Sequence, residues 1–155
     1  MSALSSKSSR IVWQTEELIC FSPLAPELFG HTLIAPRRHY ADIRDAPTSF
    51  GASVFQAAEF LALLYERKLG STGFNLLNAS GKDAEQSACH LHFYFLPRFT
   101  TDNFSTWREL PRFRVDLDDL LAKVRGQNSS IMHCPNPLQV SLDTQHCQGL
   151  PDCQD

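Results

Sequence analysis

A short run in the middle of the chain carries side chains that can handle phosphoryl groups. From His90 to Phe95 polar and apolar residues alternate strictly. A period of two is typical of a half-buried strand, so His90, His92 and Tyr94 are predicted to share one face, about 6.6 Å apart along the strand. Two imidazoles and a phenol in such a row are suited to holding phosphate oxygens. The strand is predicted to end at Pro97.

Within this row His92 is the best placed nucleophile. A neutral imidazole attacks phosphorus near neutral pH, and a neighbour that fixes its tautomer raises its reactivity. His92 lies between His90 and Tyr94, so one neighbour can orient the ring while the other donates a proton or a hydrogen bond to phosphate. Gln86 and Ser87, just before the strand, add an amide, a hydroxyl and backbone N–H groups as anion donors.

The same residues allow two other interpretations. Alternating histidines also occur on solvated sheet faces, and two histidines one residue apart can chelate zinc when a third ligand comes from elsewhere. The end of the chain is a second candidate zinc site, although its spacings match no compact zinc motif. The potential ligands there are Cys134, Cys147, Cys153, His133 and His146.

Composition and charge limit which classes of protein the chain can belong to. With 155 residues, 43% of them hydrophobic and 20% charged, the chain fits one globular domain. A formal charge of -3 argues against nucleic-acid or anionic-membrane binding through net electrostatics. The first ten residues contain no apolar run suited to a signal peptide or a membrane span. Cys20 and Cys89 lie in apolar segments, which favours free thiols and a cytoplasmic location.

The elements that must position the histidines follow from periodicity. From 48 to 69 apolar residues recur at three and four positions, which predicts one long helix, and a short helix is predicted at 116–124. The order favours an α+β fold, an antiparallel sheet of about five strands with both helices packed on one face. The predicted strands are 11–13, 18–21, 31–36, 74–78 and the histidine strand from residue 90.

Three segments are predicted along the chain. Residues 1–10 are expected to be a disordered lead-in and 11–126 the folded domain. Residues 127–155 contain several prolines and polar residues and are expected to be a poorly ordered tail.

Three motifs, in this order and spacing, resemble the histidine-triad family of nucleotide hydrolases and transferases. They are Gly30–His39, Gly73–Asn78 and Gln86–Arg98. The resemblance extends roughly from Ile11 to Trp107. It implies a metal-independent α+β domain without a cofactor that forms a homodimer and binds purine nucleotides or their conjugates.

The resemblance also implies a role for each matching residue. His92 would attack the α-phosphate and form a transient nucleotidyl-histidine, which water then hydrolyses. His90 and His31 would form a supporting network around it. The residues implied in binding phosphate, leaving group or nucleoside are Asn78, Gln86, Ser87, Tyr94 and Leu24.

Two residues depart from the family pattern. Tyr94 stands where the family has its third histidine, and Pro23 stands where many relatives carry an aspartate that holds the ribose. A phenol, with a reference pKa of about 10, is a neutral donor at working pH. The departures leave open a binding module that holds nucleotides without turnover. Arg98 is a further candidate for an outer phosphate, and His39 is expected to be a surface turn residue.

Overall fold

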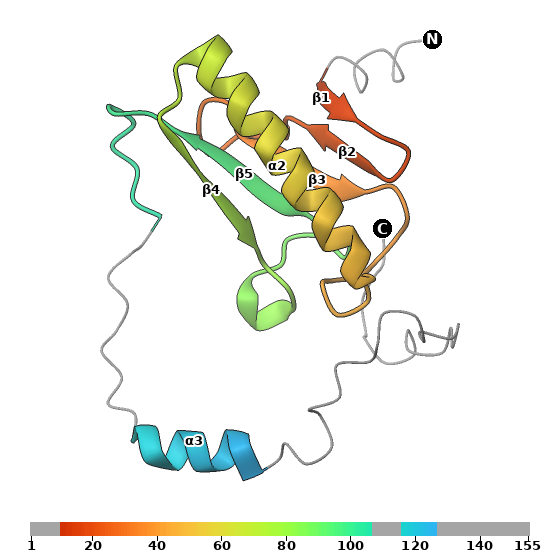
Figure 1. Ribbon diagram of the computed structural model, residues 1–155, viewed down its shortest axis with the longest axis vertical. Coiled ribbons are helices and arrows are strands. Elements are labelled where there is room, and N and C mark those ends of the chain that lie inside the picture. The colour runs from red at the N-terminus through yellow and green to blue at the C-terminus, as the bar shows by residue number, and fades with distance from the viewer. Residues whose placement is uncertain (1–9, 107–115, 127–155) are drawn as a thin grey trace. The chain divides into compact units, whose positions relative to one another are not determined.

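In the described part of the chain, five short antiparallel strands form one sheet, in the order β1-β2-β3-β5-β4. The computed structural model describes residues 10–106 and 116–126 (Figure 1). The predicted α+β fold with a five-stranded antiparallel sheet is confirmed. The strands are β1 (Ile11–Gln14), β2 (Leu18–Phe21), β3 (Thr32–Pro36), β4 (Gly73–Asn78) and β5 (Phe93–Arg98).

One long helix, α2 (Thr48–Leu69), covers one face of the sheet, as Figure 1 shows. Its bounds agree with the predicted helix. Its last turn carries Arg67 and Lys68, which suit the negative end of the helix dipole. Gly70 follows in the left-handed conformation, and its N–H donates to the carbonyl of Glu66. Sequence signals local to the helix therefore determine where it ends.

The core lies between α2 and the sheet. The buried face of α2 includes Leu61 and Tyr65, which pack against Ile34 and Phe95. The Tyr65 and Thr32 hydroxyls are 2.6 Å apart inside this core, so the one polar group of the aromatic ring is satisfied by β3. Strand residues that point toward α2 are thus anchored, and their neighbours in sequence point to the opposite face.

Cys20 belongs to the same core. It is fully buried on β2, and this burial raises the pKa of its thiol to about 12. The thiol is therefore protonated at physiological pH and behaves as a small hydrophobic group, as predicted.

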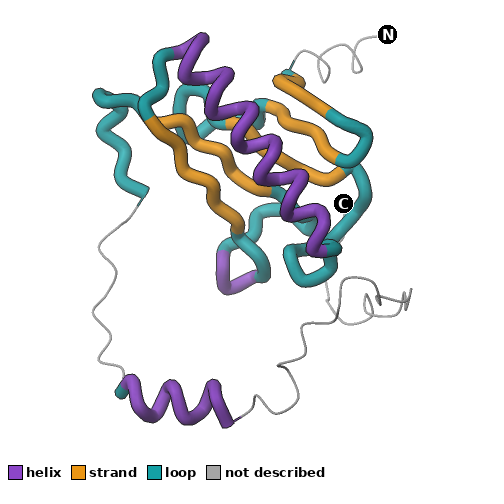
Figure 2. The backbone as a smooth tube through the Cα atoms, in the orientation of Figure 1, coloured by secondary structure: helices purple, strands orange, loops and turns teal. Residues whose placement is uncertain are grey.

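The predicted strand beginning at His90 is wrong in its first part. β5 begins at Phe93, where it pairs with Ile34 on one side and Asn78 on the other. Asn78 is the last residue of β4, and the chain then leaves the sheet in a loop that contains η1 (Lys82–Ala84) (Figure 2). β4 ends at Asn78, and the last two residues of β3, Ala35 and Pro36, pair only with β2, so His90 and His92 lie in the loop before β5.

Gly30 allows a loop to cross close to the end of β5. Its φ is +81°, and a Cβ placed there would lie 2.7 Å from Cγ of Pro97. A side chain at this position would therefore have two costs, a clash with Pro97 and backbone strain from the positive φ. The close approach fixes the entry of β3 and places His31 beneath the sheet face that α2 leaves free.

The chain divides into two units after Thr106. The second unit contains α3 (Leu117–Gly126), where Asp116 accepts hydrogen bonds from the N–H groups of Asp118 and Asp119 as an N-cap. The predicted cap is confirmed, whereas the predicted domain end at 126 stays a prediction. Most of the predicted lead-in (residues 1–9) and the predicted tail (residues 127–155) lie outside the described residues. Trp107 lies outside them as well.

Among the described helices none combines the length and the hydropathy that a membrane span requires.

Gly30 and Gly51 provide a matched pair of substitutions. Gly30→Ala should lower the free energy of unfolding by about 2 kcal/mol, because alanine is strained at positive φ and its Cβ meets Pro97. Gly51→Ala in α2 should raise it by about 0.5–1 kcal/mol, because no atom lies within 4 Å of the new methyl group. Urea denaturation measures both. Equal effects of the two substitutions would contradict this account of Gly30.

Candidate active site

His92, Tyr94 and Ser87 form a hydrogen-bonded chain before and at the start of β5. The His92 Nε2 atom is 3.0 Å from the Tyr94 hydroxyl oxygen, which is 3.2 Å from the Ser87 hydroxyl oxygen. Tyr94 pairs with Leu33 of β3 and Leu77 of β4, so it lies on the sheet face away from α2. The imidazole and the phenol predicted to act together are therefore in direct contact.

The hydrogen bonds of His92 determine its tautomer. Its Nδ1 atom is 2.8 Å from the carbonyl oxygen of His90, and a carbonyl can only accept. Nδ1 of the neutral ring therefore carries the proton, and Nε2 has the free lone pair. The Tyr94 hydroxyl must then donate to Nε2, and its oxygen accepts from Ser87. With only 7% of its surface exposed, His92 is a desolvated, oriented base or nucleophile.

His90 is turned away from this chain. Its Nε2–H donates to the carbonyl of Pro36, 2.9 Å away, and its Nδ1 lies 3.1 Å from Nδ1 of His39. The prediction that His90, His92 and Tyr94 project side by side is thus wrong for His90, because the chain is not extended before Phe93. His90 acts on His92 through its backbone carbonyl, not through its ring.

His39 is exposed in the loop after β3, which confirms the predicted surface position. Its ring also contacts the ring of His90, which the sequence analysis did not predict. The neighbouring Tyr40 also contributes, since its carbonyl accepts from the N–H of Leu91 at 2.7 Å. The basic and aromatic residues that follow β3 were the available signal for this contact.

His31 lies under Tyr94 and is almost fully buried, with 3% of its surface exposed. The two ring centroids are 5.6 Å apart. The N–H of Glu27 donates to Nδ1 of His31, so Nε2 carries the proton of the neutral ring. That Nε2 is the one buried side-chain nitrogen or oxygen in the described part of the chain without a hydrogen-bond partner.

The pKa of His31 is lowered from its ordinary value of 6.5. Burial is the main cause, opposed by the nearby Glu27 and reinforced by His92. His31 is thus a neutral imidazole near pH 7. The predicted grouping of His31 with His92 agrees with this geometry.

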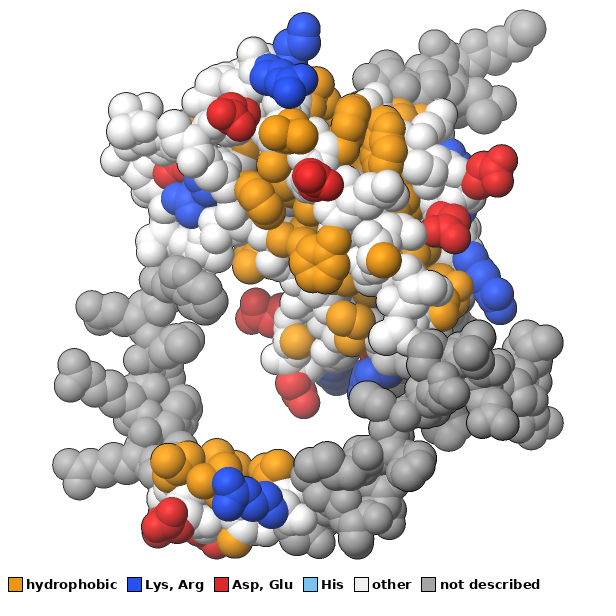
Figure 3. All heavy atoms as spheres, viewed as in Figure 1, with side chains coloured by type: hydrophobic (Ala, Val, Ile, Leu, Met, Phe, Trp, Pro, Cys, Tyr) orange, Lys and Arg blue, Asp and Glu red, His pale blue; other side chains and the backbone are white. Residues whose placement is uncertain are grey.

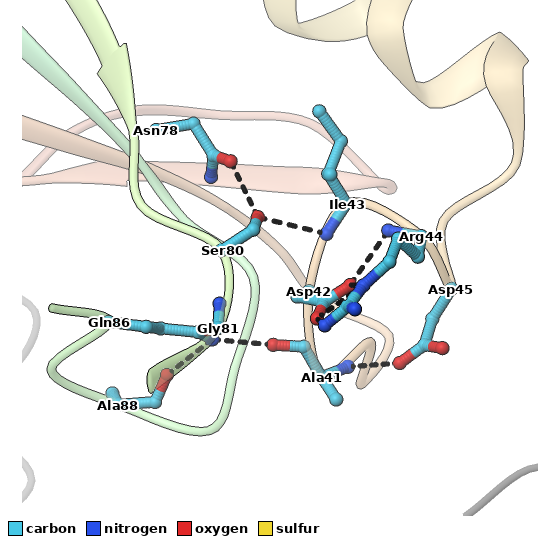
Figure 4. A network of polar contacts seen from close by, with 10 residues as sticks. All are labelled: Ala41, Asp42, Ile43, Arg44, Asp45, Asn78, Ser80, Gly81, Gln86 and Ala88. Atoms are coloured by element: carbon cyan, nitrogen blue, oxygen red, sulfur yellow. Dashed lines mark hydrogen bonds and ion pairs between the residues drawn. The ribbon is translucent and has the colours of Figure 1, made fainter. Parts of the chain in front are cut away.

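Asn78 and Gln86 hold the histidine loop in place. Asn78 donates to the carbonyl of His92 at 2.9 Å and accepts from Ser80 at 2.6 Å. The amide group of Gln86 accepts from the N–H of Gly81 and donates to two carbonyls, those of Ala41 and Ala88 (Figure 4). These amides bind the protein's own backbone, and their implied contact with phosphate stays a prediction.

The loop after β3 completes this network. Ser80 accepts from the N–H of Ile43, and Asp42 binds the side chain of Arg44 (Figure 4). Asp42 is nearly buried, and the hydrogen bond from Arg44 lowers the pKa of its carboxyl group. The carboxylate therefore stays ionised and fixes the turn that faces the histidine loop.

Arg98 does not have a free donor for an outer phosphate. Its guanidinium group binds the Asp102 carboxylate, the side chains of Asn75 and Thr106, and the carbonyl of Phe104. All its donor nitrogens are engaged, so its interpretation as a phosphate ligand is wrong for this conformation. Asp102 accepts hydrogen bonds from Arg98 and from the N–H groups of Phe99 and Phe104. These bonds hold the pKa of its carboxyl group well below its usual range.

Leu24 lies in the loop between β2 and β3, with 87% of its surface exposed. Its implied role near the nucleoside stays a prediction. Pro23 precedes it and cannot supply a carboxylate for ribose hydroxyls.

In residues 10–106 and 116–126, no three histidine, cysteine or acidic side chains are grouped closely enough to hold a metal ion. The cysteines and histidines near the end of the chain lie outside these ranges.

Acid should unfold the protein partly through His31. Because the folded pKa lies below 6.5, the unfolded chain binds the proton first, and stability falls as the pH falls below this value. Urea midpoints at about pH 7.5 and about pH 5.5 should therefore differ more for the wild type than for His31→Gln. The quantity compared between the two proteins is the change in midpoint from one pH to the other, not the midpoint at either pH. An equal difference in both proteins would contradict a neutral His31.

Removing the Gln86 amide should loosen the histidine loop. Gln86→Ala leaves three backbone groups without their partner and should cost about 1–3 kcal/mol of unfolding free energy. Gln56→Ala, an exposed position in α2, is the matched control and should change it by at most about 0.5 kcal/mol. Thermal or urea unfolding measures both, and similar losses would argue against the bracing role of Gln86.

Comparisons with known proteins agree with the fold. Residues 5–101 match the HIT domain. An uncharacterized HIT-like protein of Methanocaldococcus jannaschii is 31% identical over 76% of this chain and 90% of its own length. The adenosine 5'-monophosphoramidase HNT1 of Saccharomyces cerevisiae is 31% identical over 74% of each chain.

A third relative is the adenylylsulfatase HINT3 of Arabidopsis thaliana, 28% identical over 69% of this chain and 54% of its own length. A crystal structure of a HIT family protein from Bacillus anthracis has the same fold. It superposes with a TM-score of 0.62 at 24% identity, covering 76% of this chain and 86% of that one. The match to the HIT domain covers more than half of the sequence, and the chain therefore belongs to the HIT domain family.

Proposed function

We propose that this protein hydrolyses purine nucleotide conjugates at the α-phosphate through a covalent intermediate on His92. The observation that carries the proposal is the contact of His92 Nδ1 with the carbonyl of His90, which leaves the Nε2 lone pair directed at Tyr94. Two relatives, named as an adenylylsulfatase and an adenosine 5'-monophosphoramidase, act on nucleotide conjugates and support the substrate class.

The first step forms one bond and breaks another. The Nε2 lone pair of His92 attacks the α-phosphorus, the bond from phosphorus to the leaving group breaks, and its electron pair departs with that group. The ring now carries a positive charge, because Nδ1 keeps its proton. The carbonyl of His90, 2.8 Å from Nδ1, stabilises that charge.

The second step restores the enzyme. Water attacks the phosphorus, the bond to Nε2 breaks, and the electron pair returns to Nε2 as its lone pair. One proton of the water is released to solvent, and the nucleoside monophosphate leaves. Because His31 is a neutral ring beside the site, it adds no positive charge that would compete with the charged intermediate.

A homodimer is also proposed, from the family resemblance. Hydrophobic side chains gather over the outer side of α2 in Figure 3, and Phe55 and Leu63 are exposed there. β4 is an edge strand of the sheet, and Phe74 on it is exposed as well. Such a surface suits burial against a second copy. The cytoplasmic location stays a prediction.

The covalent intermediate gives a direct test. Incubating the full-length protein with adenylyl sulfate and quenching in the steady state should trap an adenylyl group on His92, located by peptide mass spectrometry. His92→Ala should lose the adduct and lower turnover by about 10³-fold or more, because no other group replaces the nucleophile. His146→Ala, outside the residues that match the HIT domain, is the matched control.

The result separates two functions. Turnover that persists in His92→Ala would overturn the proposed mechanism. Calorimetric binding of AMP by the wild type, without adduct or turnover of adenylyl sulfate or adenosine 5'-monophosphoramidate, would favour the nucleotide-binding module instead.

A further inference from the structure

The site contains a weak acid where cleavage of a phosphorus–nitrogen bond needs a strong one. We propose that Tyr94 sets the leaving-group class, so that the protein cleaves nucleotide mixed anhydrides, whose leaving group departs as a stable anion, in preference to phosphoramidates. This inference rests on the proposed function and narrows its substrate class. Three observations about the groups around His92 carry it.

The first observation is that the donor facing the attacking atom is a phenol. Tyr94 lies 3.0 Å from Nε2, and its own proton is directed there because its oxygen accepts from Ser87. Nε2 cannot accept from Tyr94 and attack phosphorus with the same lone pair. On attack the phenol must therefore turn its hydrogen bond to an oxygen of the phosphoryl group or of the leaving group. A phenol, with a reference pKa of about 10, can donate this bond but gives up its proton poorly.

The second observation is that neither supporting histidine can act as the acid. His31 is held neutral by burial, and its remaining proton on Nε2 belongs to an uncharged imidazole, which is a very weak acid. His90 has both ring nitrogens engaged, with the carbonyl of Pro36 and the ring of His39. No imidazolium of these residues faces the departing atom.

The third observation concerns the arginine nearest in sequence to the site. The donors of Arg98 are taken by Asp102 and its neighbours, so this cation is not available to stabilise or protonate a leaving group. The described residues around His92 thus offer hydrogen bonds but no ready proton.

Bond breaking has different demands for the two substrate classes. In a mixed anhydride the bond from phosphorus to the bridging oxygen breaks, the oxygen keeps the electron pair, and sulfate departs as a dianion that needs no proton. In a phosphoramidate the nitrogen keeps the pair and must gain a proton to leave as an amine. General acid help of this kind is worth about 10²–10⁴-fold in rate.

The test uses two substrates that share the adenosine 5'-phosphoryl group, adenylyl sulfate and adenosine 5'-monophosphoramidate. For the wild type, kcat/KM for the sulfate should exceed that for the amidate by about 10²-fold or more. Tyr94→His should reduce this ratio by about 10²-fold, and its amidate cleavage should fall as the pH rises and the new imidazolium loses its proton. Tyr94→Phe should keep the high ratio, because a phenyl ring donates no proton either.

Arg67→His, exposed at the end of α2, is the matched control for an added histidine and should leave the ratio at its wild-type value. Circular dichroism and the urea midpoint establish that each variant is folded.

The outcomes separate the two proposals. A wild type that cleaves both substrates at similar rates, or a ratio that does not change in Tyr94→His, would overturn the leaving-group inference while the proposed function stands. A wild type that forms no adduct and cleaves neither substrate would overturn the proposed function, and the inference with it.

Discussion

One hydrogen bond, from His92 Nδ1–H to the carbonyl of His90, underlies the proposed chemistry of this protein. It decides which nitrogen of His92 has a lone pair, and it offers a partner for the charge that a covalent intermediate would place on the ring. The carbonyl can do this only if the backbone around it is fixed. Three hydrogen bonds fix that backbone. The ring of His90 donates to the carbonyl of Pro36, the N–H of Leu91 donates to the carbonyl of Tyr40, and the Asn78 amide donates to the carbonyl of His92.

The sheet provides a rigid support with two chemically different faces. Residues such as Phe95 point toward α2 and form the core with Tyr65, while Tyr94, the next residue along the strand, points the opposite way and meets His92. The position of the phenol is therefore coupled to the packing of the core. His31 enters the same region through the close crossing at Gly30, and burying this imidazole lowers its pKa and keeps it neutral.

The arrangement of donors supports the proposed role of His92 as nucleophile although Tyr94 stands where the family resemblance expects a third histidine. The tautomer of His92 depends on a backbone carbonyl, which no side-chain substitution removes. Tyr94 retains the ability to donate a hydrogen bond to Nε2 or to a phosphoryl oxygen, but a phenol is a much weaker acid than an imidazolium. Under the proposed mechanism, a tyrosine at this position separates two tasks, binding the phosphoryl group and protonating the leaving group.

The sequence by itself determined the α+β class, the bounds of α2 and the Asp116 cap, because helical periodicity and capping depend on residues close in the chain. The alternation of polar and apolar residues also predicted that His92 and Tyr94 lie together, as they do. Only the tertiary structure decided that β5 starts at Phe93, since its pairing with β3 and with β4 begins there, and alternation along the sequence does not show where pairing with distant strands begins. It likewise turned His90 toward His39 and engaged the donors of Arg98, because such contacts join residues whose separation in sequence carries no periodic signal.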